Sequence, residues 1–199
     1  MRLDGGHPAL DLCNTIYGQV GEPPEHDVLA EPADLVTFAR RVGMAGQRAP
    51  AGPAALADAR ALRDALSALL HHRLLGEPPP GWAGRALEAA GRAALAAGSL
   101  TAHDGGALTW TWRDSDPHAP VHRLAYAALQ LLADAEELAR LHRCAGCCWF
   151  FLDHSRGAGR RWCSMADCGT NAKKRRYVAR RRERLTRQRG RPPRAAAAS

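Results

Sequence analysis

Residues 144–168 read CAGCCWFFLDHSRGAGRRWCSMADC and hold five of the six cysteines in the chain. Four of them form two closely spaced pairs, Cys144 with Cys147 and Cys163 with Cys168, and fifteen residues separate the pairs. Each pair lets two thiolates face one ion, and two pairs across such a loop supply the four ligands of tetrahedral zinc. The spacing therefore predicts a zinc site.

The predicted coordination indicates what the zinc would do. Four thiolates fill the tetrahedron and leave no position for a catalytic water, so we expect a structural ion. It would supply folding free energy to a segment too small to build its own core. Cys148 is an alternative ligand to Cys147, at a less usual spacing from Cys144, and is otherwise expected to be a small buried residue. The alternative to a zinc site is a set of reduced or redox-active thiols.

The residues around the cysteines predict a hairpin followed by a helix. WFFLD at 149–153 and GRRWC at 159–163 can form two short paired strands, with 155–159 as the turn. Cys163 would then lie just before a helix, and Cys168 on its first turns. This hairpin and helix would complete a small zinc module.

The segment after Cys168 predicts a strongly basic helix. Twelve basic residues and one acidic residue, Glu183, lie between positions 173 and 194. A basic helix held by a zinc knuckle can follow DNA phosphates and enter the major groove. Nonspecific nucleic-acid binding and a solvated tail without a partner are the alternatives. The residues predicted to contact DNA are Arg160, Arg161, Asn171, Lys173, Arg176 and Arg180, while Tyr177, Val178 and Leu185 are expected to dock the helix onto the zinc knuckle.

The distribution of charge also favours a polyanionic partner for the C-terminal part. The first 142 residues carry 12 arginines against 17 acidic residues, whereas the last 57 carry 16 basic residues against three acidic ones. The whole chain has a net charge of +8. Because the N-terminal part is mildly acidic and the C-terminal part is basic, only the C-terminal part is expected to bind nucleic acid.

Residues 1–142 predict an α+β domain that is mostly α. The apolar periodicity of 53–75 is the clearest helical signal, and Leu10, Cys13 and Ile16 predict a short helix after Pro8. Alternating apolar residues around Asp104-Gly105-Gly106 predict a β-hairpin. Other helices are expected near 31–44, 82–97 and 119–142, a zinc finger with its basic helix at 143–190, and a disordered tail at 191–199.

Three polar residues in the apolar N-terminal stretch are candidate ligand contacts. If Asp11, Asn14 and Thr15 are buried, they must find partners either in the protein or in a small molecule. The favoured alternative is that they cap and tie helices together. No glycine-rich phosphate loop or catalytic histidine motif accompanies them.

The cysteine segment resembles the CGNR zinc finger of bacterial transcription regulators. The resemblance rests on the two cysteine pairs and on the Arg160-Arg161-Trp162-Cys163-Ser164-Met165 block. Where the family motif spells Cys-Gly-Asn-Arg, this chain has Cys168-Gly169-Thr170-Asn171. The front domain resembles the ABATE domain through Leu10-Asp11-Leu12, Asn14-Thr15 and the run DLVTFARRVGM.

These resemblances imply a zinc-containing, DNA-binding transcription regulator. Its front domain would sense a small-molecule effector or form a homodimer. The alternative is a family member repurposed as an enzyme or small-molecule-binding protein, using a front-domain pocket, with a purely structural zinc. An enzyme is the less favoured of the two.

The sequence predicts a cytoplasmic protein that does not enter membranes. Asp4 and Asp11 interrupt the N-terminal stretch where a signal peptide would need an apolar core, and no run of 18 apolar residues occurs. In a reducing compartment, clustered cysteines bind metal more often than they form disulfides. The composition, rich in Ala, Arg, Gly and Pro with only two lysines, indicates a bacterial source.

Overall fold

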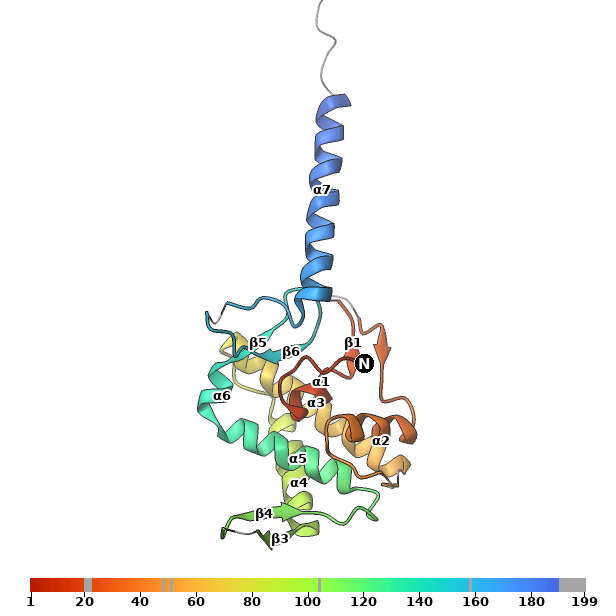
Figure 1. The fold of residues 1–199 in the computed structure, drawn as a ribbon, viewed down its shortest axis with the longest axis vertical. Coiled ribbons are helices and arrows are strands. Elements are labelled where there is room, and N and C mark those ends of the chain that lie inside the picture. Colours follow the sequence, from red (N-terminus) through yellow and green to blue (C-terminus); the bar gives the residue numbers. More distant parts are fainter. Residues whose placement is uncertain (20–22, 48, 51, 104, 158, 190–199) are drawn as a thin grey trace, which may run out of the picture.

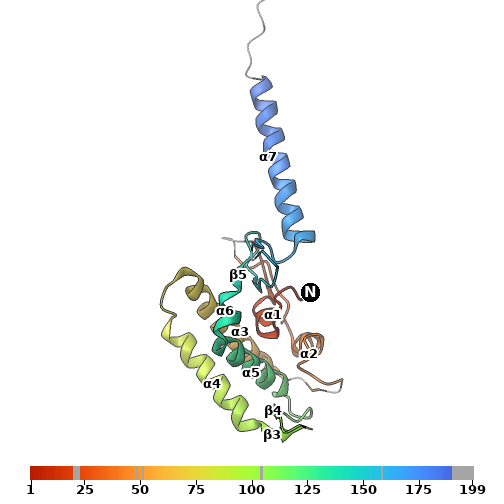
Figure 2. The ribbon, with the colours of Figure 1, turned by 60° about the vertical axis from the view of Figure 1, so that its left-hand side comes forward.

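A computed structural model describes residues 1–189 apart from 20–22, 48, 51, 104 and 158. The described part is a helical body from which one long helix projects along the longest axis (Figure 1). A small β-hairpin lies at the opposite end of the body (Figures 1 and 2). The architecture is α+β and mostly α, as the sequence predicts. The tail predicted to be disordered, 191–199, lies outside the described residues.

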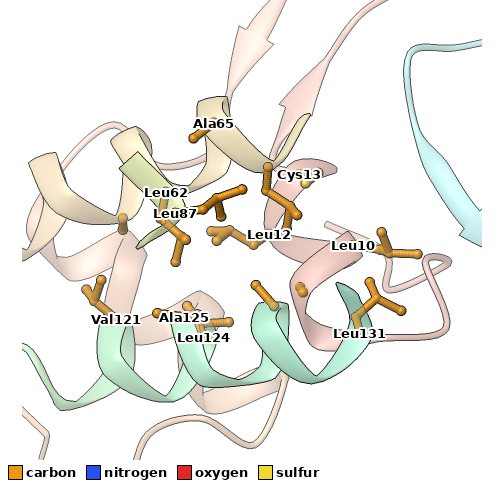
Figure 3. Close-up of a cluster of buried hydrophobic side chains, with 14 of the residues drawn as sticks. Leu10, Leu12, Cys13, Leu62, Ala65, Leu87, Val121, Leu124, Ala125 and Leu131 are labelled. Atoms are coloured by element: carbon orange, nitrogen blue, oxygen red, sulfur yellow. The ribbon is translucent and has the colours of Figure 1, made fainter. Parts of the chain in front are cut away.

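The helical body is built around a short, buried helix. α1 (Pro8–Cys13) has a proline in its first turn, and each residue from Ala9 to Cys13 is buried. Its Leu10, Leu12 and Cys13 lie in one cluster with side chains of the helices on either side of it (Figure 3). The helices around it are α2 (Pro32–Arg41), α3 (Pro53–Leu75), α4 (Gly81–Ala97), α5 (Ala119–Ala133) and α6 (Ala135–Ala139).

Three two-stranded antiparallel sheets complete the described fold. The predicted hairpin is confirmed: β3 (Ser99–Ala102) pairs with β4 (Leu108–Thr111), and Leu100 opposes Trp110. Asp104 of its turn lies outside the described residues. β1 (Ile16–Tyr17) pairs with β2 (His26–Asp27), so Ile16 is not on the first helix as predicted. The helix ends because the Thr15 hydroxyl donates to Leu12 O and the Asn14 side chain turns to another segment.

The helix predicted over 119–142 is interrupted at Asp134. The Asp134 carboxylate accepts hydrogen bonds from the backbone N–H groups of Glu136 and Glu137, so it caps a second helix, α6. The chain then becomes extended, and β5 (Leu141–Arg143) follows. The predicted boundary between the front domain and the zinc finger, at 142/143, therefore falls within a strand.

The strand of the cysteine segment pairs with a different partner from the predicted one. β6 (Phe150–Leu152) pairs with β5, with Leu141 opposite Leu152 and Arg143 opposite Phe150. Residues 159–163, predicted as its partner, form no strand. The hairpin of the zinc module thus encloses the first cysteine pair instead of the loop between the pairs.

The strand β6 and the residue before it, Trp149, are buried on both faces. Phe150 and Leu152 belong to the main hydrophobic core, whereas Trp149 and Phe151 belong to a second cluster formed with the four paired cysteines. Successive side chains of a strand point to opposite faces, which explains this alternation. The uninterrupted apolar run WFFL therefore joins the cysteine cluster to the body.

The start of the chain runs along this strand and bonds to it. The side-chain amide of Asn14, fully buried, donates to Phe150 O at 2.9 Å, and its oxygen accepts from Phe150 N at 2.8 Å. Leu152 N donates to Gly5 O at 3.0 Å. A Cβ at Gly5 would lie 2.9 Å from Leu10 Cβ, so only glycine fits here. These bonds join segments more than a hundred residues apart.

We predict that Asn14→Ala destabilises the protein strongly. The substitution leaves the buried N–H and C=O of Phe150 without partners, which costs about 2–4 kcal/mol of unfolding free energy. Chemical denaturation measures the change. Asn171→Ala, at an exposed asparagine, serves as the control and should change stability by no more than about 0.5 kcal/mol. Equal effects of the two variants would contradict the structural role of Asn14.

Candidate metal centre and nucleic-acid interface

The four paired cysteines come together in one cluster, and the distances between their sulfur atoms suit tetrahedral coordination of one ion. Their ligand atoms all lie within 4.8 Å of one another. Cys163 Sγ lies 3.6 Å from Cys147 Sγ and 3.7 Å from Cys168 Sγ. Sulfurs bound to one tetrahedral zinc are about 3.8 Å apart, given a Zn–S distance of about 2.3 Å. All four side chains are buried, so the cluster fits a closed structural zinc site.

Hydrogen bonding among the clustered thiols shifts their pKa values in opposite directions. Cys147 and Cys163 hydrogen-bond to Cys144 and hold the pKa of its thiol well below the usual range. The same shared bonds raise the pKa of Cys147. Gly146 N also donates to Cys144 Sγ, at 3.4 Å. A divalent cation would supply the charge that lets the remaining thiols ionise.

Cys148 lies outside the cluster. Its thiol donates to Ile16 O at 3.5 Å, and its backbone N–H donates to Gly18 O. The neighbouring Trp149 donates from Nε1 to the same Ile16 O, at 2.9 Å. Cys148 therefore ties the cysteine segment to β1, while Cys147 is the member of this adjacent pair that faces the other three cysteines.

Packing around the Trp162 ring accounts for the tryptophan of the RRWCSM block and for the glycine that follows Cys168. A Cβ at Gly169 would lie 2.6 Å from Met165 Sδ and 3.3 Å from Trp162 Cδ1, so a larger residue would displace the Met165 side chain and press on the indole. A Cβ at Gly146 would also meet the Trp162 ring, at 3.3 Å. The indole thus packs between the two cysteine-bearing turns.

Asp153 and Arg160 fix the loop between the cysteine pairs. The Asp153 carboxylate accepts from the backbone N–H groups of Ser155 and Arg160, both at 2.9 Å. Hydrogen bonds from Ser155 and Arg160 lower the pKa of Asp153 to about 2. The Arg160 guanidinium donates to Trp162 O and Cys163 O and lies 4.6 Å from the centre of the Phe151 ring. Arg160 is therefore engaged within the zinc module, although the sequence suggests a DNA contact.

The last cysteine lies in a short π-helical turn at the base of the basic helix. η1 (Met165–Gly169), a π-helical turn, carries Cys168 and continues directly into α7 (Thr170–Arg189). Asn171 donates from Nδ2 to Asp167 Oδ1 at 3.0 Å, and Asp167 Oδ2 lies 2.8 Å from an Arg2 guanidinium nitrogen. The chain start and the zinc module thus meet at the base of α7.

α7 projects from the body as an exposed basic helix (Figures 1 and 2). Side chains from Lys173 to Arg184 are exposed, and none of them forms an ion pair with the described residues. Tyr177 is 66 % and Val178 44 % exposed, so they do not dock the helix onto the knuckle as predicted. The side chain of Leu185 lies outside the described residues. Tyr177 and Val178 are therefore largely open to solvent and available to contact a partner.

The polar residues near the start of the chain find partners inside the protein. Asp11 Oδ1 accepts from Gly5 N at 2.9 Å, and Thr15 Oγ1 accepts from Arg63 at 3.3 Å. Asn14 bonds to Phe150, as described above. None of the three lines a described cavity. They tie α1 to its neighbours, which is the alternative that the sequence favours.

Comparison with known families identifies both parts of this arrangement. Residues 6–135 match the ABATE family, described as "Putative stress-induced transcription regulator". The chain belongs to the ABATE family. Residues 140–181 match the CGNR zinc finger, which accounts for the four clustered cysteines. Among curated proteins, none matches the chain.

The ABATE match ends at the start of α6, and the CGNR match begins just before β5. The ABATE match contains α1 with its Leu10-Asp11-Leu12 and Asn14-Thr15 motifs, and the structure shows that these residues build the centre of the body. The CGNR match contains β5, β6, η1 and the first half of α7. Within the described chain, no helix is both long and apolar enough to cross a membrane.

We predict that zinc binding depends on Cys163 and not on Cys148. The purified protein should contain about one zinc per chain, and Cys163→Ser should lose most of it because the tetrahedron is incomplete. Cys148→Ser is the matched control and should retain the zinc. Metal analysis, with trypsin digestion to report exposure of the C-terminal segment, checks both variants. Full zinc content in Cys163→Ser would contradict the assignment.

We also predict an unusual dependence of stability on pH from Asp11. Burial raises the pKa of this carboxyl to about 6, above its ordinary value of 3.8. The folded state therefore holds a proton that the unfolded state loses, so stability falls as pH rises from about 4 to about 6.

Asp11→Asn should remove this fall because the amide is neutral at every pH and keeps an oxygen for Gly5 N–H. At pH 7 the variant should be more stable than the parent by on the order of 1–2 kcal/mol. Denaturation midpoints across the pH range measure the difference. Glu136→Gln, an exposed site, should follow the parent, and a destabilised Asp11→Asn at pH 7 would refute the prediction.

Proposed function

We propose that this protein is a cytoplasmic, DNA-binding transcription regulator whose zinc site holds a basic helix in position. The observation that carries the proposal is α7, a 20-residue helix whose basic side chains from Lys173 to Arg184 meet no acidic partner in the described part of the chain. Beyond its base, where it contacts η1, this helix is exposed from Lys173 to Arg184 and gains little stabilisation from the described part of the protein. DNA phosphates would supply the missing negative charge.

The dimensions and the side chains of α7 suit a major groove. Twenty residues of helix are about 30 Å long, and the groove is about 12 Å wide, enough to admit an α-helix. We assign phosphate contacts to Lys173, Arg176, Arg180 and the exposed Arg161, and a base or phosphate contact to Asn171. The exposed Val178 offers an apolar contact of the kind that a thymine methyl accepts.

The zinc would act by positioning. Cys144, Cys147, Cys163 and Cys168 would bind it, and the bound ion would fix η1 and therefore the direction in which α7 leaves the body. Arg160, engaged with the loop that bears Cys163, takes a positioning role in this proposal. The zinc is thus a structural cofactor of a DNA-binding surface.

The front domain would regulate this surface. We propose residues 1–142 as the part that senses a small-molecule effector or forms a homodimer, and residues 143–190 as the DNA-binding part. β5 and β6 support communication between them, because this hairpin contributes both to the main core and to the cysteine cluster. An effector that shifts α5 or α6 would reach the zinc module through β5.

Binding to a labelled DNA duplex of about two helical turns tests the proposal. Fluorescence anisotropy should show an affinity that falls steeply with salt, by about one power of the salt concentration per phosphate contacted. The double variant Arg176→Gln/Arg180→Gln should lower this slope by about two, because each lost phosphate contact removes about one. Failure of the parent to bind at low salt would refute DNA binding.

Two further comparisons make this test specific. Arg85→Gln/Arg92→Gln removes two exposed arginines from α4 and should leave binding unchanged, since that helix lies away from α7 (Figure 1). Selection from a library of random duplexes should return a consensus sequence if the protein is a regulator. Binding without any consensus would support the alternative of a nonspecific nucleic-acid-binding protein.

A further inference from the structure

A groove in the front domain lies where α3, α4 and α5 meet. Its volume is about 310 Å³, within the range of small-molecule sites. It belongs neither to the cysteine cluster nor to α7. Its lining combines an apolar floor with a polar rim and consists of Asp58, Ala61, Leu62, Ala86, Ala89, Ala90, Ala93, His118, Val121 and His122.

The floor of the groove is part of the main core. Leu62 of α3 and Val121 of α5 are buried members of the cluster shown in Figure 3. Four alanines on the facing side of α4 keep that wall low, because their side chains are too short to fill the space above the floor. An apolar body could rest on this surface and remove it from water.

The rim carries two histidines and one carboxylate, that of Asp58, and Asp116 lies beside the histidines without lining the groove. His118 Nε2 lies 3.4 Å from Asp58 Oδ2, and His122 Nδ1 lies 3.7 Å from Asp116 Oδ2. The two imidazole rings are stacked, with centres 6.1 Å apart. Two imidazoles and one carboxylate that can accept hydrogen bonds therefore lie at the rim of an apolar groove.

His122 is an incompletely satisfied member of this rim. Its Nδ1 is buried and has no hydrogen-bond partner among the described residues, since 3.7 Å to Asp116 is too long. Burial lowers the pKa of His122 below its usual value, which keeps the ring neutral near pH 7. A neutral imidazole has a lone pair to offer, and neither lysine nor arginine lines the groove.

We propose that this groove binds a small primary amine with an apolar body. The body would cover Leu62 and Val121, and the ammonium would donate to the Asp58 carboxylate and to the neutral imidazole at the rim. An anionic ligand would meet the Asp58 carboxylate and neither lysine nor arginine in the lining. A neutral alcohol could fill the floor but would gain no charge-assisted hydrogen bond to Asp58.

The inference deepens the proposed sensing role of the front domain and rests on it only for an effect on DNA. The amine would act by holding the start of α5 against α3 and α4. The other end of α5 leads through α6 to β5 and so to the zinc module. Binding of the amine itself can be measured without DNA.

Amide NMR titration and calorimetry of the full zinc-loaded chain test the inference. Phenethylamine is the probe, and phenethyl alcohol and hydrocinnamate are its neutral and anionic counterparts. We expect the amine to bind with a Kd on the order of 1 mM and to shift resonances of α3, α4 and α5 around the groove. The alcohol should bind about ten-fold more weakly, since a charge-assisted hydrogen bond is lost.

Variants locate the site and its charge. Asp58→Asn, at an exposed position, should bring the amine's affinity close to that of the alcohol, whereas Glu136→Gln should have no effect. Ala89→Leu should block both ligands by filling the groove, and Ala33→Leu on α2 controls for added bulk. Equal affinities for amine, alcohol and acid, or amine binding that Ala89→Leu leaves intact, would overturn the inference.

The outcome is distinguishable from that of the proposed function. Amine binding with no DNA binding by the parent would leave the groove assigned and would refute the regulator. DNA binding with no shift in the groove at about 10 mM amine would refute the groove and leave the regulator intact. If the groove also regulates DNA binding, saturating amine should change the DNA affinity of the parent and not that of Ala89→Leu, and DNA should change the amine affinity by the same factor.

Discussion

The structure depends on the burial of one three-residue strand on both of its faces. β6 sends Phe150 and Leu152 into the core of the helical body, while Phe151 and the adjacent Trp149 pack with the four clustered cysteines. Its backbone is satisfied by β5 on one side and by Asn14 and Gly5 on the other. Removing the strand would open the body and the metal site together, so neither is independent of the other.

This constraint explains why a small metal site can hold a long, unsupported helix. The cysteine segment has too few apolar residues for a core of its own, and it gains rigidity from the zinc tetrahedron and from the body beneath it. α7 then leaves from a turn that contains one of the four cysteines, Cys168. Its charge is matched by no described part of the protein, which is why a polyanion is the partner that its surroundings favour.

Local sequence signals predicted most of the helices and the cysteine pairs. Pro53 and Gly76 bound α3 as the sequence indicates, because proline suits a first helical turn and Gly76 adopts the left-handed conformation that ends it. Prediction failed where a distant contact outweighed a local pattern. The apolar stripe over 119–142 gave no sign that Asp134 would cap a second helix, and WFFLD could not reveal that its partner strand lies before the first cysteine.

The sequence by itself determined the four thiols, the helix-forming stretches and the separation of charge, because each depends on the spacing of nearby residues. Only the tertiary structure decided which polar groups are structural and which are free. Asn14 and Phe150 bond across 136 positions, Arg160 is engaged at the cysteine loop, and Tyr177 stays exposed. Whether such a group finds a partner depends on which distant segments fold against it. The spacing of residues along the chain does not contain this information.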